Sequence, residues 1–265
     1  MEDKRLADLV TRTSGLLRDQ PNLHEANARG VHQRVRRRIL TSDGSWKDER
    51  KSYLEIQVSG RTQADDGMPA ASWVVFQGEN PNDLPAWEQI ERDVRALGAD
   101  LERIRTAPVG DAGKAVVLFE RRAVGQLLRR MLVDHLGETP DAETPGNNNS
   151  SSQFDGVTSA FAPRLAQRIG PTFLNVWDDP RQRKGPDGAA LFGAFDADDE
   201  AVPSERVSLI EGGVLKTLLM SRTPRREISR SNGHARGAVQ GGAMRGRAGN
   251  LYVSGGTSGL SDSAL

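Results

Sequence analysis

Hydrophobic residues recur at helical spacing in three stretches of the first half of the chain. Residues 4–19 place leucine and valine near one face of a helix, and Pro21 ends that pattern. Residues 84–106 predict a longer helix, and Pro85 lies near its first turn, where the missing N–H costs little. Residues 122–136 predict a third helix. The apolar positions behind these predictions are Leu6, Leu9, Val10, Leu16, Leu17, Trp87, Ile90, Val94, Leu97, Leu101, Ile104, Val124, Leu127, Leu128, Met131, Leu132 and Leu136.

An alternating pattern predicts antiparallel strands between the first two helices. In residues 53–59, leucine, isoleucine and valine occupy the even positions and more polar side chains occupy the odd ones. This period of two is typical of a strand with one buried face. Turn sequences at residues 42–44 (SDG) and 65–67 (DDG) flank the strand, so we expect a hairpin followed by a third strand over residues 73–78.

The second half of the chain has weaker periodicity. The continuous apolar run 115–119 is typical of a strand buried on both faces. Residues 172–177 predict another strand, and a glycine pair at 212–213 between the apolar runs 207–210 and 214–220 predicts a hairpin. From residue 221 onward the apolar pattern ends.

These patterns predict an α+β fold, with antiparallel-rich mixed sheets and packed helices. Composition divides the chain further, because residues 137–152 are rich in Asn, Ser and Pro and predict a flexible loop. The predicted organisation is an N-terminal helix and polar linker (1–34), an α/β portion with a hairpin and two helices (35–136), the loop (137–152), a β-rich portion (153–220) and a poorly ordered Gly/Arg/Ser-rich tail (221–265).

Composition narrows the classes of function. The 265 residues include 36 basic and 36 acidic side chains, and this balance argues against a dedicated nucleic-acid or membrane coat. Without cysteine the chain forms no disulfide and offers neither a thiol nucleophile nor a thiolate ligand. No apolar run reaches membrane-spanning length and the N-terminus does not resemble a signal peptide, so we expect a cytoplasmic protein without a membrane partner.

Two charged clusters are candidates for binding. Spaced carboxylates could hold a hard cation, but Ala201 stands where a calcium loop needs glycine, so a solvated turn is the favoured interpretation. A run of arginines interleaved with glycine could follow a phosphate backbone, yet only Tyr252 is available for base stacking, and a solvated flexible segment is favoured instead. The clusters comprise Asp196, Asp198, Asp199 and Glu200, and Arg222, Arg225, Arg226, Arg230, Arg236, Arg245 and Arg247.

The four histidines carry no recognisable catalytic motif. Neither G-x-S-x-G nor H-E-x-x-H occurs, so His24, His32, His135 and His234 are each expected at the surface. His135 ends a predicted helix, where a positive charge is favoured by the helix dipole.

Several blocks, taken in order, resemble the TldD/PmbA family of peptidases, once named modulators of DNA gyrase. The resemblance extends over roughly residues 35–255, and the most specific block is 195–226, which is similar to the family's Phe-Asp-Asp-Glu-Gly-Val-Pro and Leu-Ile-Glu-Asn-Gly-Val-Leu-Lys stretches. The other blocks are 39–44 (ILTSDG), 107–110 (APVG) with 115–118, 158–161 (TSAF), 175–180 (NVWDDP) and 231–236 (SNGHAR). Family members are considerably longer, so the resemblance implies a TldD/PmbA-like fold that is incomplete at both ends.

The resemblance also implies a zinc site, which this chain lacks. The family's active subunit carries His-Glu-x-x-x-His on a helix, with a cysteine as third ligand. Alignment on Leu127-Leu128 places Arg129, Arg130 and Asp134 at the His, Glu and His positions. Two histidines five residues apart are rotated by about 140° on a regular helix, so binding zinc through both requires a local distortion. Guanidinium groups cannot ligate zinc, and a register shifted by one residue restores only His135.

We therefore expect no catalytic residue, no bound metal and no cofactor in this chain, and leave its peptide-binding residues unassigned. The resemblance implies a catalytically degenerate, PmbA-like partner subunit in a zinc peptidase complex that acts on unstructured peptides. The partner would be a catalytic TldD-like homologue or a second copy of this chain, and activity of the chain alone is not expected. Two alternatives stay open: nucleic-acid binding through residues 222–247, which is disfavoured by the balanced charge, and a truncated product without independent function.

Overall fold

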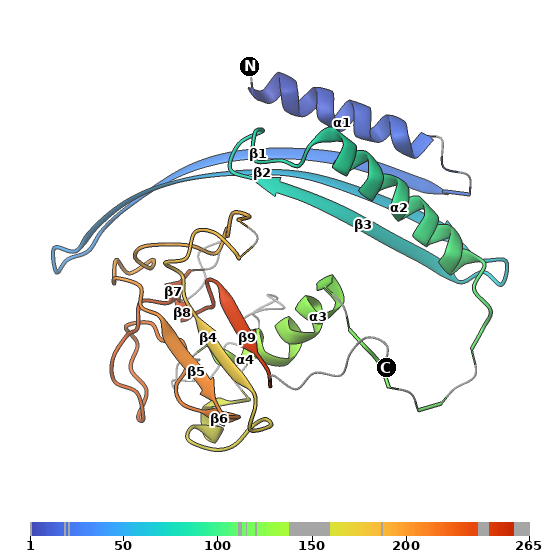
Figure 1. The fold of residues 1–265 in the computed structure, drawn as a ribbon. Coiled ribbons are helices and arrows are strands. Elements are labelled where there is room, and N and C mark those ends of the chain that lie inside the picture. Colours follow the sequence, from blue (N-terminus) through green and yellow to red (C-terminus); the bar gives the residue numbers. More distant parts are fainter. Residues whose placement is uncertain are drawn as a thin grey trace, which may run out of the picture. The chain divides into compact units, whose positions relative to one another are not determined.

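The computed structural model describes residues 2–18, 20, 22–110, 113–114, 116–119, 121–137, 160–186, 188–237 and 244–256. The chain divides into two compact units (Figure 1). The first comprises Met1–Arg37, Glu49–Lys114 and Gly188–Ala190, and the second comprises Arg38–Asp48, Ala115–Asp187 and Leu191–Leu265. The helical residues after position 120 thus group with the second unit, whereas the sequence pattern placed them with the first hairpin.

The first unit is an antiparallel sheet with two helices on one face (Figure 1). Its elements are α1 (Glu2–Arg18), β1 (Glu25–Leu40), β2 (Trp46–Gln63), β3 (Pro69–Gly78) and α2 (Trp87–Arg105). The strand order is β1-β2-β3, and the register of β2 and β3 sets Ser59 opposite Trp73. The predicted helices over 4–19 and 84–106, the hairpin and the third strand are confirmed.

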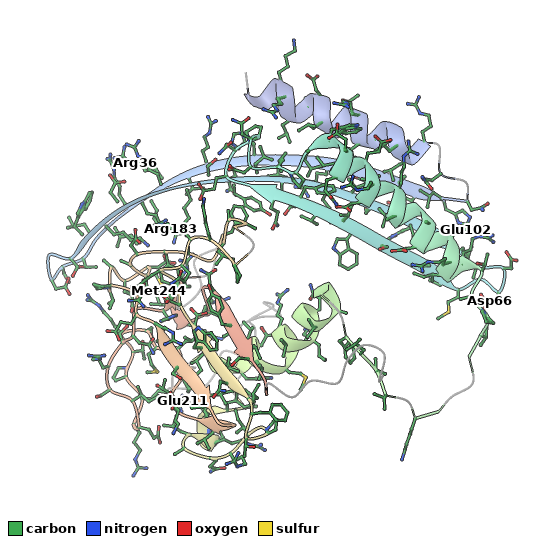
Figure 2. The ribbon with its side chains drawn as sticks, viewed as in Figure 1. Arg36, Asp66, Glu102, Arg183, Glu211 and Met244 are labelled. Atoms are coloured by element: carbon green, nitrogen blue, oxygen red, sulfur yellow. The ribbon has the colours of Figure 1, made fainter. Side chains whose placement is uncertain are left out.

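Alternation along β2 determines which face the helices cover. Leu54, Ile56 and Val58 are fully buried and form one core with apolar residues of α1 and α2, including Leu101. Gly60 continues this buried face, and a Cβ atom there would lie 2.9 Å from Cδ1 of Leu101, so glycine lets α2 approach the sheet closely. Charged side chains such as Glu102 of α2 lie outside this core (Figure 2).

The prediction of a polar linker up to residue 34 is wrong, because β1 begins at Glu25. Most side chains of β1 are exposed or only half-buried, Arg36 among the exposed ones (Figure 2). A strand without a buried face has no alternating pattern to detect, and pairing of its backbone to β2 orders it instead.

The second unit is built from short elements. They are α3 (Arg121–Leu128), the π-helical turn η1 (Arg129–Val133), α4 (Asp134–Leu136), the 3₁₀ turn η2 (Ala162–Arg164), β4 (Asn175–Asp178), β5 (Val207–Glu211), β6 (Val214–Leu215), β7 (Ala235–Arg236), β8 (Arg245–Gly246) and β9 (Leu251–Ser254). One sheet has the order β6-β5-β4-β9, and β7 pairs with β8. The β5–β6 hairpin turns at Gly212 and Gly213 as predicted, with φ angles of 54° and 77° that favour glycine.

Two predictions for this unit are wrong. Residues 116–119 form no strand and are exposed, from 86% for Val116 to 46% for Phe119. The region beyond residue 221 is not a poorly ordered tail where the structure describes it, because β9 pairs along its whole length with β4. The Gly/Arg/Ser-rich composition led to the wrong prediction, because this segment is ordered by pairing with a distant strand and not by an apolar face of its own.

The α+β fold class is confirmed, and the strand pairings among the described residues of both units are antiparallel. The second apolar core gathers β4, β5 and β6 with Leu132 and Leu136 of the helical segment. None of the helices in the described part of the chain combines the length and apolarity needed to cross a membrane. The predicted loop 137–152 lies, apart from Gly137, outside the described residues.

Candidate functional site

The helix that carries the candidate metal positions is not regular. Between α3 and α4, the turn η1 is π-helical, and the backbone N–H of Asp134 donates a hydrogen bond to the carbonyl oxygen of Arg129. A bond of this span makes residues five apart neighbours on successive turns, whereas a regular helix would rotate them by about 140°. The turn therefore has the distortion that two ligands at this spacing require.

The side chains on this turn do not suit zinc. Arg129, Arg130 and Asp134 are all exposed. Two of the three are guanidinium groups, which have no lone pair to donate at working pH. Across the described residues, no group of three or more His, Cys, Asp or Glu could hold a metal ion. The backbone of this turn therefore suits two metal ligands five residues apart, but the side chains that it carries do not suit a metal.

His135, which the shifted register offers as a ligand, packs against another ring. Its imidazole lies 5.6 Å from the ring of Phe161, centroid to centroid, at a tilt of 58°. The neighbouring Leu132 and Leu136 are buried in the second core and fix the helix in place. His135 lies at the end of this helix, as predicted, but it is half-buried rather than at the surface.

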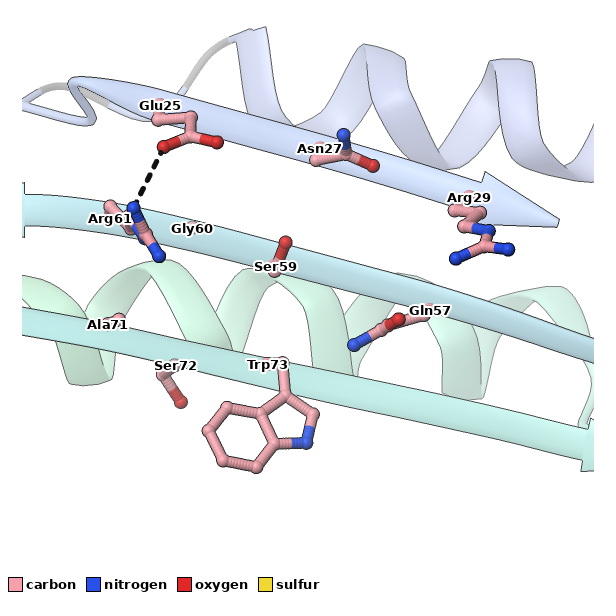
Figure 3. Close-up of a pocket in the computed structure, with 10 residues that line it drawn as sticks. All are labelled: Glu25, Asn27, Arg29, Gln57, Ser59, Gly60, Arg61, Ala71, Ser72 and Trp73. Carbon is pink, nitrogen blue, oxygen red and sulfur yellow. Dashed lines mark hydrogen bonds and ion pairs between the residues drawn. The ribbon is translucent and has the colours of Figure 1, made fainter. Parts of the chain in front are cut away.

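The first unit has a polar pocket on the sheet face opposite its helices (Figure 3). Its volume is about 400 Å³, and it is lined by Gln57, Ser59, Gly60 and Arg61 of β2 together with residues of β1 and β3. Trp73 is 46% exposed there and lies opposite Ser59. Glu25 and Arg61 form an ion pair of 3.4 Å across the pocket, and Arg29 has no carboxylate partner among the described residues. The pocket thus offers an aromatic surface, neutral polar groups and one uncompensated positive charge.

A hydrogen-bonded group continues the same face beyond the pocket. Tyr53 donates to Glu55, and the side-chain amide of Gln77 donates to both, at 2.8 Å and 3.0 Å. Burial, reinforced by the Glu55 carboxylate, raises the pKa of Tyr53 to about 12. The phenol therefore stays protonated at neutral pH, and the face presents an ordered, hydrogen-bonding surface.

The sequence predicted His234 at the surface, and this prediction is wrong, because His234 is fully buried. Its Nε2 lies 3.0 Å from Oδ2 of Asp178, and its Nδ1 lies 2.8 Å from the backbone oxygen of Asn232. The same Asp178 oxygen accepts a hydrogen bond from the backbone N–H of Gly249 at 3.1 Å. Asp178 and His234 therefore connect β4 to the segment beyond residue 230, which is a structural role. Each residue lies in a block that resembles the family, 175–180 and 231–236, but nothing in the sequence pairs these two blocks.

The acidic cluster forms a turn as expected, but only part of it is solvated, since Asp196 is 80% exposed and Asp198 is not. Asp198 is fully buried, and its carboxylate accepts hydrogen bonds from three backbone N–H groups, those of Glu200, Val202 and Ala235, each at 2.9 Å. Lys47, from the tip of the first hairpin, donates to the backbone oxygens of Ala197 and Asp198. The cluster thus organises its own loop and anchors the hairpin tip, and it is not open for a cation.

Two side chains of the arginine-rich segment, Arg222 and Arg230, form ion pairs. Arg222 lies 2.7 Å from Asp43 of the hairpin tip, and this contact, after those of Thr41 and Ser45, helps hold the pKa of Asp43 well below its usual range. Arg230 pairs with Glu205 at 3.2 Å. The side chains of Arg222 and Arg230 are therefore solvent-exposed as expected, at 40% and 80%, but each is held in an ion pair.

Comparison with known proteins identifies the family. The sequence model of the PmbA/TldA metallopeptidase C-terminal domain matches residues 112–264. A metalloprotease of Methanocaldococcus jannaschii is 39% identical over 64 residues, which are 24% of this chain and 13% of that protein.

Three solved structures share the fold over 97% of this chain. A Bacteroides thetaiotaomicron protein named as a modulator of DNA gyrase has a TM-score of 0.69 at 14% identity, with 51% of its length covered. A Thermotoga maritima protein of the same name has a TM-score of 0.65 at 16% identity, and TldE from Thermococcus kodakarensis has 0.64 at 15%, each with 53% covered. The chain thus spans about half the length of these structures. On the family match and the shared fold together, this chain belongs to the TldD/PmbA family of metallopeptidase-related proteins.

Proposed function

We propose that this chain is a catalytically degenerate partner in a zinc peptidase complex of the TldD/PmbA type. The observation that carries the proposal is the π-helical turn, which has the geometry for two ligands five residues apart but presents Arg129 and Asp134 instead. Its role would be to shape the path of the peptide and to dock a homologue that carries the His-Glu motif. The chain itself would bind neither zinc nor another cofactor.

The open face of the first sheet supports a peptide-binding role. β1 and β3 are the outer strands of this sheet, and the outer strands of a sheet can pair with an added extended chain. Such pairing draws affinity from backbone groups and makes little demand on sequence, which suits unstructured peptides as substrates. Trp73 and the polar groups beside it would contact side chains of the bound segment.

The direct test measures zinc content and peptide hydrolysis of the purified chain, alone and mixed with a homologue that carries His-Glu-x-x-x-His. We expect no stoichiometric zinc and no hydrolysis from the chain alone, and a change in the homologue's activity when the two are mixed. Stoichiometric zinc together with hydrolysis by the lone chain would refute the proposal.

A chelation test examines the turn itself. The double variant Arg129→His/Asp134→His places two imidazoles at the five-residue spacing, and Arg130→His/Asp134→His is its matched control at a spacing of four. A π-helical turn favours the first pair, whereas a regular helix favours the second. We expect the first variant to bind Ni²⁺ more tightly by calorimetry. Tighter binding by the second would show that the turn is a regular helix in solution.

Nucleic-acid binding through residues 222–247 is the weaker candidate. The ion pairs of Arg222 and Arg230 neutralise part of the charge that phosphate contacts would need. Binding of single strands that weakens with salt, and that is lost when this segment is deleted, would favour it over the peptidase role.

A further inference from the structure

The second unit contains a pocket that the proposed peptidase role does not use. It lies on the β6-β5-β4-β9 sheet and has a volume of about 430 Å³. Two of its walls are Trp177 of β4 and Tyr252 of β9, which are direct cross-strand neighbours. Their rings are parallel to within 5°, with centroids 5.5 Å apart, and the guanidinium carbon of Arg206 lies 5.2 Å from the centroid of the Trp177 ring.

The pocket carries excess positive charge. Lys184 and Arg206 both line it, and neither has a carboxylate partner among the described residues. The pocket's carboxylate, Asp179, is 4% exposed and already occupied, because Nε and Nη2 of Arg181 lie 3.0 Å and 3.3 Å from its two oxygens. This contact with Arg181 lowers the pKa of Asp179. Asp179 therefore remains ionised and paired with Arg181, and it neutralises neither Lys184 nor Arg206.

Two neutral polar groups complete the lining. Burial, reinforced by the carboxylates of Asp179 and Asp178, raises the pKa of Tyr252, so its phenol remains a neutral hydrogen-bonding group. The side chain of Gln182 adds an amide, which can donate and accept at the edge of a flat ring.

Sheet stability explains only part of this arrangement. A cross-strand aromatic pair stabilises its sheet, and a guanidinium over one of the rings adds to that. Neither effect requires a second cation, Lys184, at the same pocket or an open volume in front of the rings.

We propose that this pocket binds a small anion that carries a flat aromatic ring. The ring packs against the Trp177–Tyr252 pair, as bases and aromatic side chains do on such surfaces. The anionic group pairs with Arg206, whose planar fork suits phosphate and carboxylate, and with Lys184. A nucleoside monophosphate and an aromatic carboxylate both have this chemistry. The inference does not depend on the proposed peptidase role.

Calorimetric titration of the full chain with four probes tests the proposal. Adenosine monophosphate and N-acetyl-L-phenylalanine combine ring and charge, N-acetyl-L-phenylalaninamide has the ring without the charge, and inorganic phosphate has the charge without a ring. At least one of the first two should bind, and each single-feature probe should bind about tenfold or more weakly than it. The tighter of the first two identifies the source of the ligand. No binding of either, or equal binding of phosphate alone, would overturn the proposal.

Variants of the residues that line the pocket test whether the probe binds there. Lys184→Ala and Arg206→Ala change exposed side chains and should each weaken the better probe about tenfold. Trp177→Leu should abolish its binding. The matched controls are Lys216→Ala, an exposed lysine beside Glu211, and Trp73→Leu in the other pocket. Equal weakening by a control and its matched variant would refute the assignment to this pocket.

Discussion

The two units of this chain satisfy their backbone polar groups in different ways. In the first unit, three strands of ten to eighteen residues and two helices of seventeen and nineteen residues pair most of the backbone within themselves. In the second unit, the strands have only two to five residues, and much of the chain runs between them. Backbone N–H groups that find no carbonyl partner in a helix or strand must therefore donate to buried side chains.

Asp198, Asn232 and Asp178 perform this task in the second unit. Asp198 accepts three backbone N–H groups, and Asn232 accepts the N–H of Met220 at 2.8 Å while donating to the oxygen of Leu218 at 2.9 Å. Polar residues in the blocks that resemble the family can therefore be structural. An acidic run without a catalytic partner can indicate an irregular loop, whose backbone N–H groups need carboxylates as hydrogen-bond acceptors.

The largest expected effect is that of Asp198→Ala. Removing this carboxylate leaves three backbone N–H groups without their acceptor, and we expect the free energy of unfolding of the second unit to fall by about 3–5 kcal/mol. Urea unfolding followed by residue-resolved hydrogen exchange measures it. The matched control is Asp196→Ala, whose side chain is 80% exposed and pairs with Arg183, and it should lose less than about 1 kcal/mol. Similar losses in both variants would contradict the inference that the second unit depends on buried side-chain acceptors.

Leu101→Ala should be the corresponding change in the first unit. Leu101 is 1% exposed and packs in the apolar core, so its truncation leaves a cavity and should cost about 3 kcal/mol. The loss should appear in hydrogen exchange of α2 and β2 and leave the second unit unaffected. Ile104→Ala, on the same helix but 52% exposed, serves as control and should change stability by about 0.5 kcal/mol or less. A comparable loss from Ile104→Ala would show that apolar burial does not determine the stability of this unit.

Acid should weaken the first unit through Glu102. Hydrogen bonds from Arg105 and then Asn22 lower the pKa of this carboxyl from 4.5 to about 2. The stabilisation is complete above pH 4.5 and is lost as the pH falls toward 2, because the unfolded state takes up the proton first. The unfolding midpoint of Glu102→Gln should therefore depend less on pH across this window than that of the unaltered chain. An unchanged pH profile would contradict the predicted linkage.

A smaller effect of opposite sign is expected from Glu200 in the second unit. Burial raises the pKa of this carboxyl above 4.5, although the backbone N–H of Arg222 donates to it. The folded state then holds the proton more tightly, so stability falls as the pH rises from 4.5 through the folded pKa. Glu200→Gln keeps an acceptor and removes this loss, and it should slightly raise the unfolding midpoint at neutral pH. A lowered midpoint would show that the charge itself stabilises the loop.

The helices and β2 could be predicted from sequence because their apolar spacing reflects a single buried face. Leu54, Ile56 and Val58 lie two apart and all face the helices. The predicted hairpin included the end of β1 beside its turn, but residues 25–34 of β1 and all of β9 were not predicted, because backbone pairing rather than side-chain burial orders them. The run 116–119 has the composition of a buried strand but is exposed, since burial depends on a partner surface that composition does not specify.

For the candidate site, the resemblance located positions 129, 130 and 134 and required a distortion between them, and the structure has a π-helical turn there. The pairing of Asp178 with His234 could not be read from the sequence, although both lie in family-like blocks, because these blocks are far apart in the chain. The aromatic pair of Trp177 and Tyr252 was missed for the same reason.

From the sequence alone follow the family resemblance, the elements with a strong apolar period and the expectation that the zinc-binding side chains are absent. These depend on residue identity and local spacing, which the chain fixes directly. The burial of Asp198 and His234 and the pairing of Arg222 and Arg230 with distant carboxylates follow only from the tertiary structure. It also brought Trp177 and Tyr252 together at one pocket. Burial and pairing of polar groups depend on which segments meet in space, and local pattern does not contain that information.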